Sequence, residues 1–354
     1  MKALILSGGK GTRLRPITHT GAKQLIPVAN KPILFYGIES IKDADITEIG
    51  IVVGDTSQEI SDAVGDGSKF GVSVTYIKQD APLGLAHAVL ISKEFLKDDE
   101  FVMYLGDNLI KDGITNLVEQ FKKEKPNSQI LLAHVKNPNQ FGVAELVDSK
   151  VSRLEEKPSR PKTDLALVGV YMFDKHIHDA VRAIKPSKRG ELEITDAIQW
   201  LIDNGYNVLP HIVKGWWKDT GKLEDLLEAN RMMLDMLELN IMGDIDEHSK
   251  VEFKVVVEEG AIVEHSTIRG PSIIGRDARI LNSYIGPFSS ISSGARVINS
   301  EIEHSIILEN SIIEDVDTKI EDSLVGRNVE VRRSTEKPKV YRLLLGDNSK
   351  VGLI

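Results

Sequence analysis

The sequence predicts an α/β chain in which a mostly parallel sheet covered by helices is followed by a parallel β-helix. Over the first 240 residues, short aliphatic runs alternate with helical stretches, a pattern typical of parallel strands joined by helices. Beyond residue 250, aliphatic residues recur at steps of five or six, which is the pattern of a β-helix. The predicted domains are therefore 1–240 and 241–354, the second ending in a cap.

Five aliphatic runs in the first part predict strands, and glycine or aspartate follows several of them. These runs are residues 3–6, 48–54, 73–79, 101–107 and 129–135. Helices are predicted over 33–44, 113–124 and 222–240 from their apolar spacing. Ligands of such sheets bind at the carboxyl ends of the strands. The loop after the first strand and Asp107 after the fourth therefore mark the expected functional edge.

The repeat in the second part holds its step over fourteen aliphatic positions. These are Val257, Val263, Ile268, Ile274, Ile280, Ile285, Ile291, Val297, Ile302, Leu308, Ile313, Ile320, Val325 and Val331. A longer period of seventeen runs through Val257, Ile274, Ile291, Leu308 and Val325. We expect four to five coils whose aliphatic residues point inward and stack. The register slips between Ile313 and Ile320, and residues 341–354 leave the repeat as a cap.

Composition limits the function. The chain has 354 residues, of which 41% are hydrophobic and 5% aromatic, and its net charge is −9. An acidic chain poor in aromatic residues is unlike a nucleic-acid binder. The absence of cysteine excludes disulfides, thiolate metal sites and a cysteine nucleophile. No apolar run approaches the roughly 18 residues of a membrane span, so we expect a cytoplasmic protein without nucleic-acid or membrane partners.

A glycine-rich loop follows the first predicted strand, "LSGGKGTRLRP" at residues 6–16, and it carries Lys10 and Arg13. No Gly-Lys-Ser/Thr follows, so it is not a Walker loop, and a leucine occupies the third glycine position of a dinucleotide fingerprint. Its glycines allow the backbone to approach an anion closely, and they are Gly8, Gly9 and Gly11. The loop predicts phosphate binding, with an ordinary glycine-rich turn as the alternative.

From this loop the chain continues through Lys23 into "LIPVANKPI", and "YLGDN", "FGVAEL", "LEEKPSRP", "KPSKRGELEITDA" and "WWKDTG" follow. In this order the segments resemble the sugar-1-phosphate nucleotidylyltransferases over essentially the whole chain. The resemblance implies a Rossmann-like sheet of the nucleotide-diphospho-sugar transferase type and a left-handed β-helix. It also implies transfer of a thymidylyl group from dTTP to glucose 1-phosphate, with release of pyrophosphate.

This chemistry needs no general base, because the sugar phosphate that attacks is already ionised at neutral pH. It needs in-line placement of two anions and cancellation of their charge. By resemblance, Arg13 and Lys23 neutralise the triphosphate and Lys157 binds the sugar phosphate. Asp107 and Asp219 would hold Mg²⁺, which prefers one or two carboxylates together with phosphate oxygens and water.

The same resemblance assigns the remaining contacts. The nucleotide set is Gly8, Gly9, Gly11, Thr12, Arg13, Gln24, Gln79 and Gly84, in which the two glutamines read the base. The sugar-phosphate set is Gly142, Glu156, Lys157 and Gly169. Arg189 and Glu191 either support the sugar wall or form a salt-bridged helix start.

Three other functions stay open at this point. A uridylyltransferase differs by one methyl group of the base, which a pocket discriminates by only about 1–3 kcal/mol. Acyl transfer in the β-helix would need a base such as His265 or His304 between coils. A scaffold without turnover would not need the catalytic set. The β-helix itself is predicted to organise a homo-oligomer and to perform no chemistry.

Overall fold

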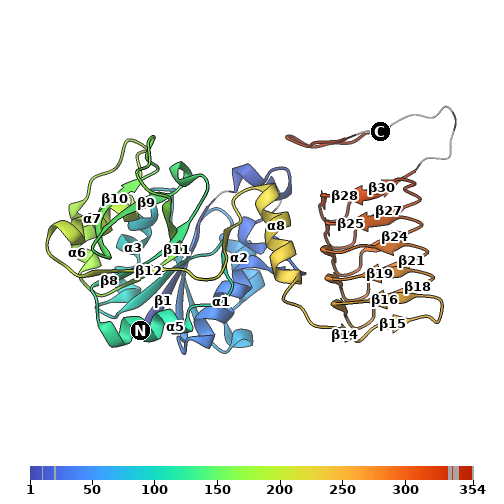
Figure 1. Cartoon of the computed structure of the whole chain (residues 1–354), viewed down its shortest axis with the longest axis horizontal. Coiled ribbons are helices and arrows are strands. Elements are labelled where there is room, and N and C mark those ends of the chain that lie inside the picture. Colours follow the sequence, from blue (N-terminus) through green and yellow to red (C-terminus); the bar gives the residue numbers. More distant parts are fainter. Residues whose placement is uncertain (10, 20, 334–336, 338–342, 353–354) are drawn as a thin grey trace. The chain divides into compact units, whose positions relative to one another are not determined.

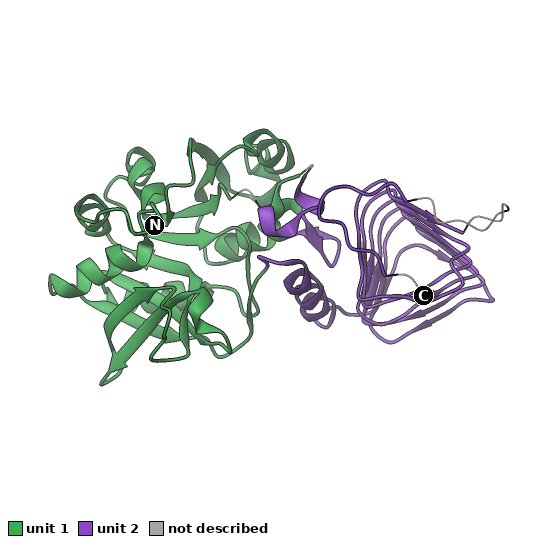
Figure 2. Cartoon of the chain, turned by 90° about the horizontal axis from the view of Figure 1, so that it is seen from above, with its two compact units in different colours: residues 1–10, 21–25, 33–219 green, residues 11–20, 26–32, 220–354 purple. Residues whose placement is uncertain are grey.

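The computed structural model describes residues 1–9, 11–19, 21–333, 337 and 343–352. The chain forms two compact units, shown in Figure 2. Unit 1 comprises residues 1–10, 21–25 and 33–219, and unit 2 comprises 11–20, 26–32 and 220–354. Two short segments near the N-terminus thus belong to the second unit. The domain boundary at 240/241 stays a prediction.

Unit 1 is built on a nine-stranded mixed sheet. Its strands are β1 (Lys2–Ser7), β4 (Glu48–Val53), β5 (Ser73–Lys78), β6 (Phe101–Leu105), β8 (Ser128–His134), β9 (Gly142–Val147), β10 (Lys150–Glu156), β11 (Leu165–Phe173) and β12 (Val208–Ile212). Seven of them follow the order β10-β9-β11-β6-β1-β4-β5, and β8 pairs with β11 and β12. The strands β6, β1, β4 and β5 are parallel, whereas β11 runs antiparallel to β6, β8 and β9.

Helices connect these strands. The α-helices are α1 (Ile33–Asp43), α2 (Ser57–Val64), α3 (Leu85–Ile91), α4 (Lys93–Leu96), α5 (Thr115–Glu124), α6 (Ile177–Ala183), α7 (Ile194–Asp203) and, in unit 2, α8 (Leu223–Leu234). Short 3₁₀ turns are η1 (Thr12–Leu14), η2 (Ile17–His19), η3 (Lys23–Leu25), η4 (Ser68–Phe70) and η5 (Pro138–Gln140). Two-stranded pairs are β2 (Pro27–Val28) with β3 (Lys31–Pro32), and β7 (Asn108–Ile110) with β13 (Trp217–Asp219).

Alternate side chains of the central strand β1 pack into two separate hydrophobic cores, one on each face of the sheet. On β1, Leu4 and Leu6 pack with α3, α6 and α7 on one face of the sheet. Ala3 and Ile5 pack with α1, α2 and α5 on the other. Because both faces are covered, the strand reads as a continuous aliphatic run. The cores fix the sheet, and the loops at its carboxyl edge are positioned by it.

The five strands and two of the helices predicted for this part correspond to β1, β4, β5, β6, β8, α1 and α5, so the Rossmann-like sheet is confirmed. The antiparallel strands β9, β10 and β11 lie outside the elements that the sequence predicts. The helix expected over 222–240 is shorter than predicted, because α8 ends at Leu234.

Unit 2 contains three sheets of short parallel strands, stacked as in a β-helix (Figure 1). The first sheet contains β14 (Asn240–Ile241), β17 (Val255–Val257), β20 (Ser272–Ile274), β23 (Ser289–Ile291), β26 (Ile306–Ile307) and β29 (Leu324–Val325). The second contains β15 (Asp244–Ile245), β18 (Ile262–Glu264), β21 (Arg279–Leu281), β24 (Arg296–Ile298), β27 (Ile312–Glu314) and β30 (Glu330–Arg332). The third contains β16 (Lys250–Glu252), β19 (Thr267–Arg269), β22 (Tyr284–Ile285), β25 (Glu301–Glu303) and β28 (Ile320–Glu321).

The predicted β-helix is therefore confirmed, with two corrections. Two of its sheets have six strands among the described residues, which exceeds the four to five coils expected. The inward residue of the fifth coil is Ile307, which pairs with Ile291 below and Val325 above. Leu308, which the period of seventeen selects, is buried outside this stack. A shortened turn before Ile307 and a lengthened one after it keep the aliphatic column continuous.

The part of the expected C-terminal cap that is described, residues 343–352, contains no helix or strand. Its leucines are exposed, Leu344 by 94%. Residues 341, 342, 353 and 354 lie outside the described residues. Within the described ranges, none of the helices combines the length and the apolar character needed to cross a membrane.

Candidate active site

The predicted phosphate loop begins where β1 ends, at the carboxyl edge of the unit 1 sheet. A β-carbon on Gly8 would lie 3.3 Å from the Gln79 amide oxygen, and one on Gly9 would lie 3.1 Å from the Lys23 side chain. The first two glycines are therefore seated directly beside two other predicted site residues. Lys10, to which the sequence assigned extra charge, lies outside the described residues.

Lys23 and Asp107 form an ion pair at this edge, between η3 and the end of β6. Both side chains are mostly buried, with 15% and 14% of their surface exposed. Burial alone would raise the pKa of Asp107, but the Lys23 ammonium and a hydrogen bond from Asn108 hold that pKa below its ordinary value. The carboxylate is therefore ionised at neutral pH, and its partner Lys23 lies beside Gly9.

The second predicted carboxylate, Asp219, is brought next to the first by strand pairing. In the β7–β13 ladder, Asp219 lies opposite Asn108, the residue after Asp107. The two acids are more than a hundred residues apart in sequence. The pairing therefore brings two aspartates from distant segments to one place, here called the two-carboxylate edge. Their role as a metal pair stays a prediction. Among the described residues, no group of three or more metal-binding side chains is present.

Asn108 organises this edge, although it is not among the predicted site residues. Its amide nitrogen donates to the Asp107 carboxylate at 3.0 Å, and its amide oxygen accepts from the Gly169 N–H at 3.3 Å and the Trp217 indole at 2.5 Å. A β-carbon on Gly169 would lie 2.6 Å from that oxygen, so only glycine fits there. The signal in the sequence is its place directly after Asp107 in "YLGDN".

The two glutamines expected to read the base differ in their hydrogen bonds. Gln24 is 1% exposed, and its amide oxygen has no hydrogen-bond partner among the described residues. The Gln79 amide nitrogen donates to the Gly84 carbonyl at 3.3 Å and contacts His87 Nδ1 at 3.0 Å. A buried, unpaired amide oxygen at Gln24 is suited to accept a hydrogen bond from a ligand.

Gly84 has a structural reason to be glycine. Its φ of 104° lies in the region that side chains avoid, and a β-carbon would come within 2.3 Å of the Leu192 carbonyl oxygen. The neighbouring backbone, and not open space for a base, therefore fills the position of the missing side chain. The part of Gly84 in base binding stays a prediction.

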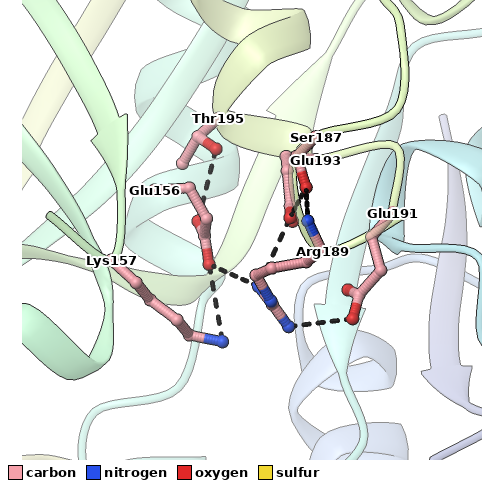
Figure 3. A network of polar contacts seen from close by, with 7 residues as sticks. All are labelled: Glu156, Lys157, Ser187, Arg189, Glu191, Glu193 and Thr195. Carbon is pink, nitrogen blue, oxygen red and sulfur yellow. Dashed lines mark hydrogen bonds and ion pairs between the residues drawn. The ribbon is translucent and has the colours of Figure 1, made fainter.

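The predicted sugar-phosphate residues form a polar network, drawn in Figure 3. Glu156, at the end of β10, accepts a hydrogen bond from the Thr195 hydroxyl at 3.2 Å and contacts Lys157 Nζ at 3.6 Å. A β-carbon on Gly142 would lie 2.6 Å from Thr195 and 3.2 Å from the Glu156 carboxylate. The network therefore leaves Glu156 between a hydroxyl and a cation, and the side chain of that cation, Lys157, is partly exposed.

Arg189 joins this network from the loop before α7. Its guanidinium contacts Glu156 at 3.3 Å, Glu191 at 2.9 Å and Glu193 at 3.3 Å (Figure 3). Ser187 donates to the same Glu193 carboxylate at 2.8 Å. The salt-bridged helix start predicted for "KRGELEITDA" is therefore present. The same arginine also contacts Glu156, whose sugar role stays a prediction.

Aromatic packing ties the sugar-phosphate network to the two-carboxylate edge. The Phe141 ring packs edge-on against Trp217 of β13, with 5.4 Å between the ring centroids. The Phe141 carbonyl accepts the Lys157 N–H at 3.0 Å. The two groups of predicted residues in unit 1 are therefore positioned by one continuous set of contacts.

Three predicted nucleotide residues belong to unit 2. Gly11 has a positive φ of 63° and accepts the Thr18 hydroxyl at its carbonyl, 2.7 Å away. Thr12 and Arg13 open η1 and are exposed. Their roles toward a nucleotide stay predictions, as do all the assigned site roles.

The histidines that an acyl-transfer site would use lie on the surface of the β-helix. His265 contacts Asp246 at 3.1 Å with 62% of its side chain exposed, and His304 contacts Asp322 at 3.8 Å with 37% exposed. Each has an acidic partner from a neighbouring coil. The described residues give neither histidine a partner nucleophile.

A glycine loop, a buried lysine and two aspartates lie at one edge of the sheet, and the sequence profile of the nucleotidyl transferase family matches residues 2–236. The chain belongs to this family, which confirms the predicted enzyme class. It is 58% identical over 353 residues to a glucose-1-phosphate thymidylyltransferase of Streptomyces antibioticus, and the match covers 99% of each chain. It is 55% identical over 351 residues to the Streptomyces griseus protein of that name, again with 99% of each covered.

A solved structure shares the fold at lower coverage. A Bacillus anthracis protein, in complex with sucrose, superimposes with a TM-score of 0.64 and 38% sequence identity. The match covers 68% of this chain and 98% of the other.

The geometry around Glu156 predicts a pH dependence. Burial, with the negative charge of Glu193, raises the pKa of Glu156 above its ordinary value despite the opposing Lys157. Glu156 is predicted to bind the sugar phosphate, and a protonated carboxyl group loses hydrogen-bond acceptor capacity. As pH falls, KM for glucose 1-phosphate should therefore increase. Because the pKa of Glu156 is raised, the increase should already begin at pH values higher than ~4.3, the ordinary pKa of glutamate. Steady-state kinetics of the chain and its Glu156→Gln variant measure this effect, since titration of the sugar phosphate is common to both. Parallel pH profiles of the two proteins would contradict it.

Proposed function

We propose that this chain transfers a thymidylyl group from dTTP to glucose 1-phosphate and releases pyrophosphate. The observation that carries the proposal is the buried Lys23–Asp107 pair beside Gly9, with Asp219 brought alongside by the β7–β13 ladder. Similarity over the full length to thymidylyltransferases supports the choice of base and sugar.

The reaction forms one bond and breaks one. An oxygen of the sugar phosphate attacks the α-phosphorus of dTTP, and the bond from that phosphorus to the β-phosphate oxygen breaks, leaving pyrophosphate with the electron pair. No proton is transferred. The protein therefore has to hold two anions in line and offset their repulsion. Lys23 supplies charge at the α-phosphoryl group and Arg13 at the triphosphate, while Lys157 holds the sugar phosphate.

Asp107 and Asp219 are proposed to hold Mg²⁺. The donor set suits this ion, because a site with two carboxylates leaves its other ligand positions to phosphate oxygens and water. When bound, Mg²⁺ supplies positive charge to the phosphate oxygens. Asn108 holds the Asp107 carboxylate in place by its 3.0 Å hydrogen bond.

The base is proposed to meet the Gln24 and Gln79 amides, one of which has an unpaired buried oxygen. These amides fit thymine and uracil alike, so the methyl group decides between them, by about 1–3 kcal/mol. Equal dTTP and UTP, offered together with glucose 1-phosphate and Mg²⁺, should yield mainly dTDP-glucose by mass spectrometry. A product that is mainly UDP-glucose would instead favour the uridylyltransferase.

Replacing Lys157 by alanine is expected to raise KM for glucose 1-phosphate by about tenfold to a hundredfold, the usual worth of a hydrogen bond to a charged group. KM for dTTP should stay within about threefold, because the nucleotide is held at the other end of the site. Lys162→Ala is the matched control, since Lys162 is an exposed lysine five positions away that contacts Glu145 at 3.2 Å. Steady-state kinetics measure both constants. Loss of dTTP affinity with sugar affinity intact would reverse the assignment.

The homo-oligomer through the β-helix and the cytoplasmic location remain proposals. The β-helix supports the first, because its sheets expose strand faces on the surface of a stack. Light scattering of the full chain measures the oligomer.

A further inference from the structure

A short hairpin of the N-terminal region belongs to the same compact unit as the β-helix. It consists of β2 and β3, paired through Val28 and Lys31, with a two-residue turn at Ala29 and Asn30. Both turn residues have positive φ, 46° and 60°. This is the twist of a tight hairpin turn, which asparagine tolerates and alanine adopts only under strain. Surrounding contacts must therefore hold Ala29 in place.

The contacts come from one buried amide, Asn230 of α8, which is 1% exposed. Its oxygen accepts the Ala29 N–H at 2.8 Å and the Ser290 hydroxyl at 2.7 Å. Its nitrogen donates to the Phe288 carbonyl at 3.2 Å. A single side chain therefore joins the hairpin turn to the first sheet of the β-helix.

Asn30 makes a second bridge from the turn itself. Its amide nitrogen donates to the Ile291 carbonyl at 2.8 Å, and its oxygen accepts the Ser292 hydroxyl at 3.1 Å. Ala29 also packs in a small apolar cluster with Leu234 and Ile273. Polar and apolar contacts thus fix the hairpin on the coil that contains β23.

The hairpin follows the proposed catalytic segment with one residue, Ile26, between them. η3 contains Lys23 and ends at Leu25, and Ile26 begins the segment that is part of unit 2. We propose that Asn230 is a positioning residue for nucleotidyl transfer, because it fixes the hairpin to the β-helix and thereby one end of the Lys23 segment. The inference rests on the proposed role of Lys23. It gives the β-helix a function in catalysis besides assembly.

A purely structural role would lower stability without changing the turnover of folded protein. A positioning role predicts a different pattern. A displaced Lys23 would stabilise the transition state less, while Glu156 and Lys157 would still bind the sugar phosphate. In the full chain, Asn230→Ala should therefore lower kcat by about tenfold to a hundredfold and leave KM for glucose 1-phosphate within about twofold.

The matched pair of variants is Ser290→Ala and Ser300→Ala. Both serines are almost fully buried in the β-helix, at 1% and 3% exposure. Ser290 donates to Asn230, whereas Ser300 donates to the Ile298 carbonyl and accepts the Val316 N–H. Ser290→Ala should lower kcat about fivefold, the worth of one neutral hydrogen bond. Ser300→Ala should leave kcat unchanged, even if it lowers the melting temperature as much as Ser290→Ala does.

Amide hydrogen exchange gives a readout that does not depend on turnover. In Asn230→Ala, exchange of the Ala29 amide and of residues 21–25 should accelerate by about tenfold, while strands β1 and β6 keep their protection. If the wild-type chain transfers no nucleotide, the proposed function fails, but this exchange pattern still tests the coupling. Acceleration confined to residues 26–32 would overturn the inference.

A rescue variant separates conformation from stability. Glycine adopts positive φ without strain, so Ala29→Gly in the Asn230→Ala background should restore the hairpin turn without the lost hydrogen bond. We expect it to recover part of kcat. Wild-type kcat in Asn230→Ala, or equal losses in Ser290→Ala and Ser300→Ala, would overturn the positioning role.

Discussion

Asp107→Asn and Asp219→Asn are each expected to lower kcat by about a hundredfold to a thousandfold, with the fold intact. Each change removes one negative charge from the two-carboxylate edge and leaves the side-chain shape almost unchanged. Because the two acids come from distant segments joined by the β7–β13 ladder, equal sensitivity of both would show that they serve one site. Pyrophosphate release with dTTP, glucose 1-phosphate and Mg²⁺ measures the effect.

Asp107→Asn also removes the partner of a mostly buried lysine, and breaking such a pair costs about 3–5 kcal/mol of stability. A thermal melt must therefore accompany each assay. If Asp107→Asn proves to be unfolded, the test of the two-carboxylate edge depends on Asp219→Asn. Asp164→Asn is the control, because Asp164 forms an exposed pair with His134 in the same unit. Near-normal turnover in Asp107→Asn or Asp219→Asn at ordinary Mg²⁺ would remove that residue from the site.

Lys23→Ala is expected to lower kcat by about a hundredfold to a thousandfold with smaller changes in either KM. Lys23 lies between the glycine loop and Asp107, so its ammonium is positioned before substrate arrives and can stabilise charge that develops at the α-phosphoryl group. Rapid-quench measurement of the first turnover isolates this step from product release.

Lys93→Ala serves as the control for lost lysine charge. Lys93 forms a surface pair with Asp98 at 2.6 Å, away from the glycine loop in the sequence and in its contacts. An effect of Lys23→Ala that appears only in KM for dTTP would assign Lys23 to binding and not to the chemical step.

The sequence was sufficient for elements whose pattern is local. The buried parallel strands β1, β4, β5 and β6 appear as aliphatic runs, and the β-helix repeats its step visibly. Strands β9, β10 and β11 were missed because their segments were interpreted as site motifs. Ile307 was missed because one shortened turn shifts the inward position by one residue, and a fixed period cannot follow such a shift.

The site was predictable only where a residue type implies its chemistry. Asp107 and Asp219 were selected as a pair by resemblance, and only the β7–β13 ladder gives the physical reason for their proximity. Asn108 and Asn230 were not predicted, because an asparagine becomes informative through its partners, which are remote in sequence. Gly84 shows the reverse case, in which a site glycine is required by the backbone of Leu192.

Direct attack of the sugar phosphate on dTTP is tested most sharply by stereochemistry at the α-phosphorus. The diastereomer of dTTPαS that the chain accepts is converted with glucose 1-phosphate, and the configuration of the thio-product is determined by ³¹P NMR. One in-line displacement predicts inversion, in keeping with a site that uses cations and carboxylates and no protein nucleophile. Retention of configuration would require a nucleotidyl-enzyme intermediate and would contradict the mechanism.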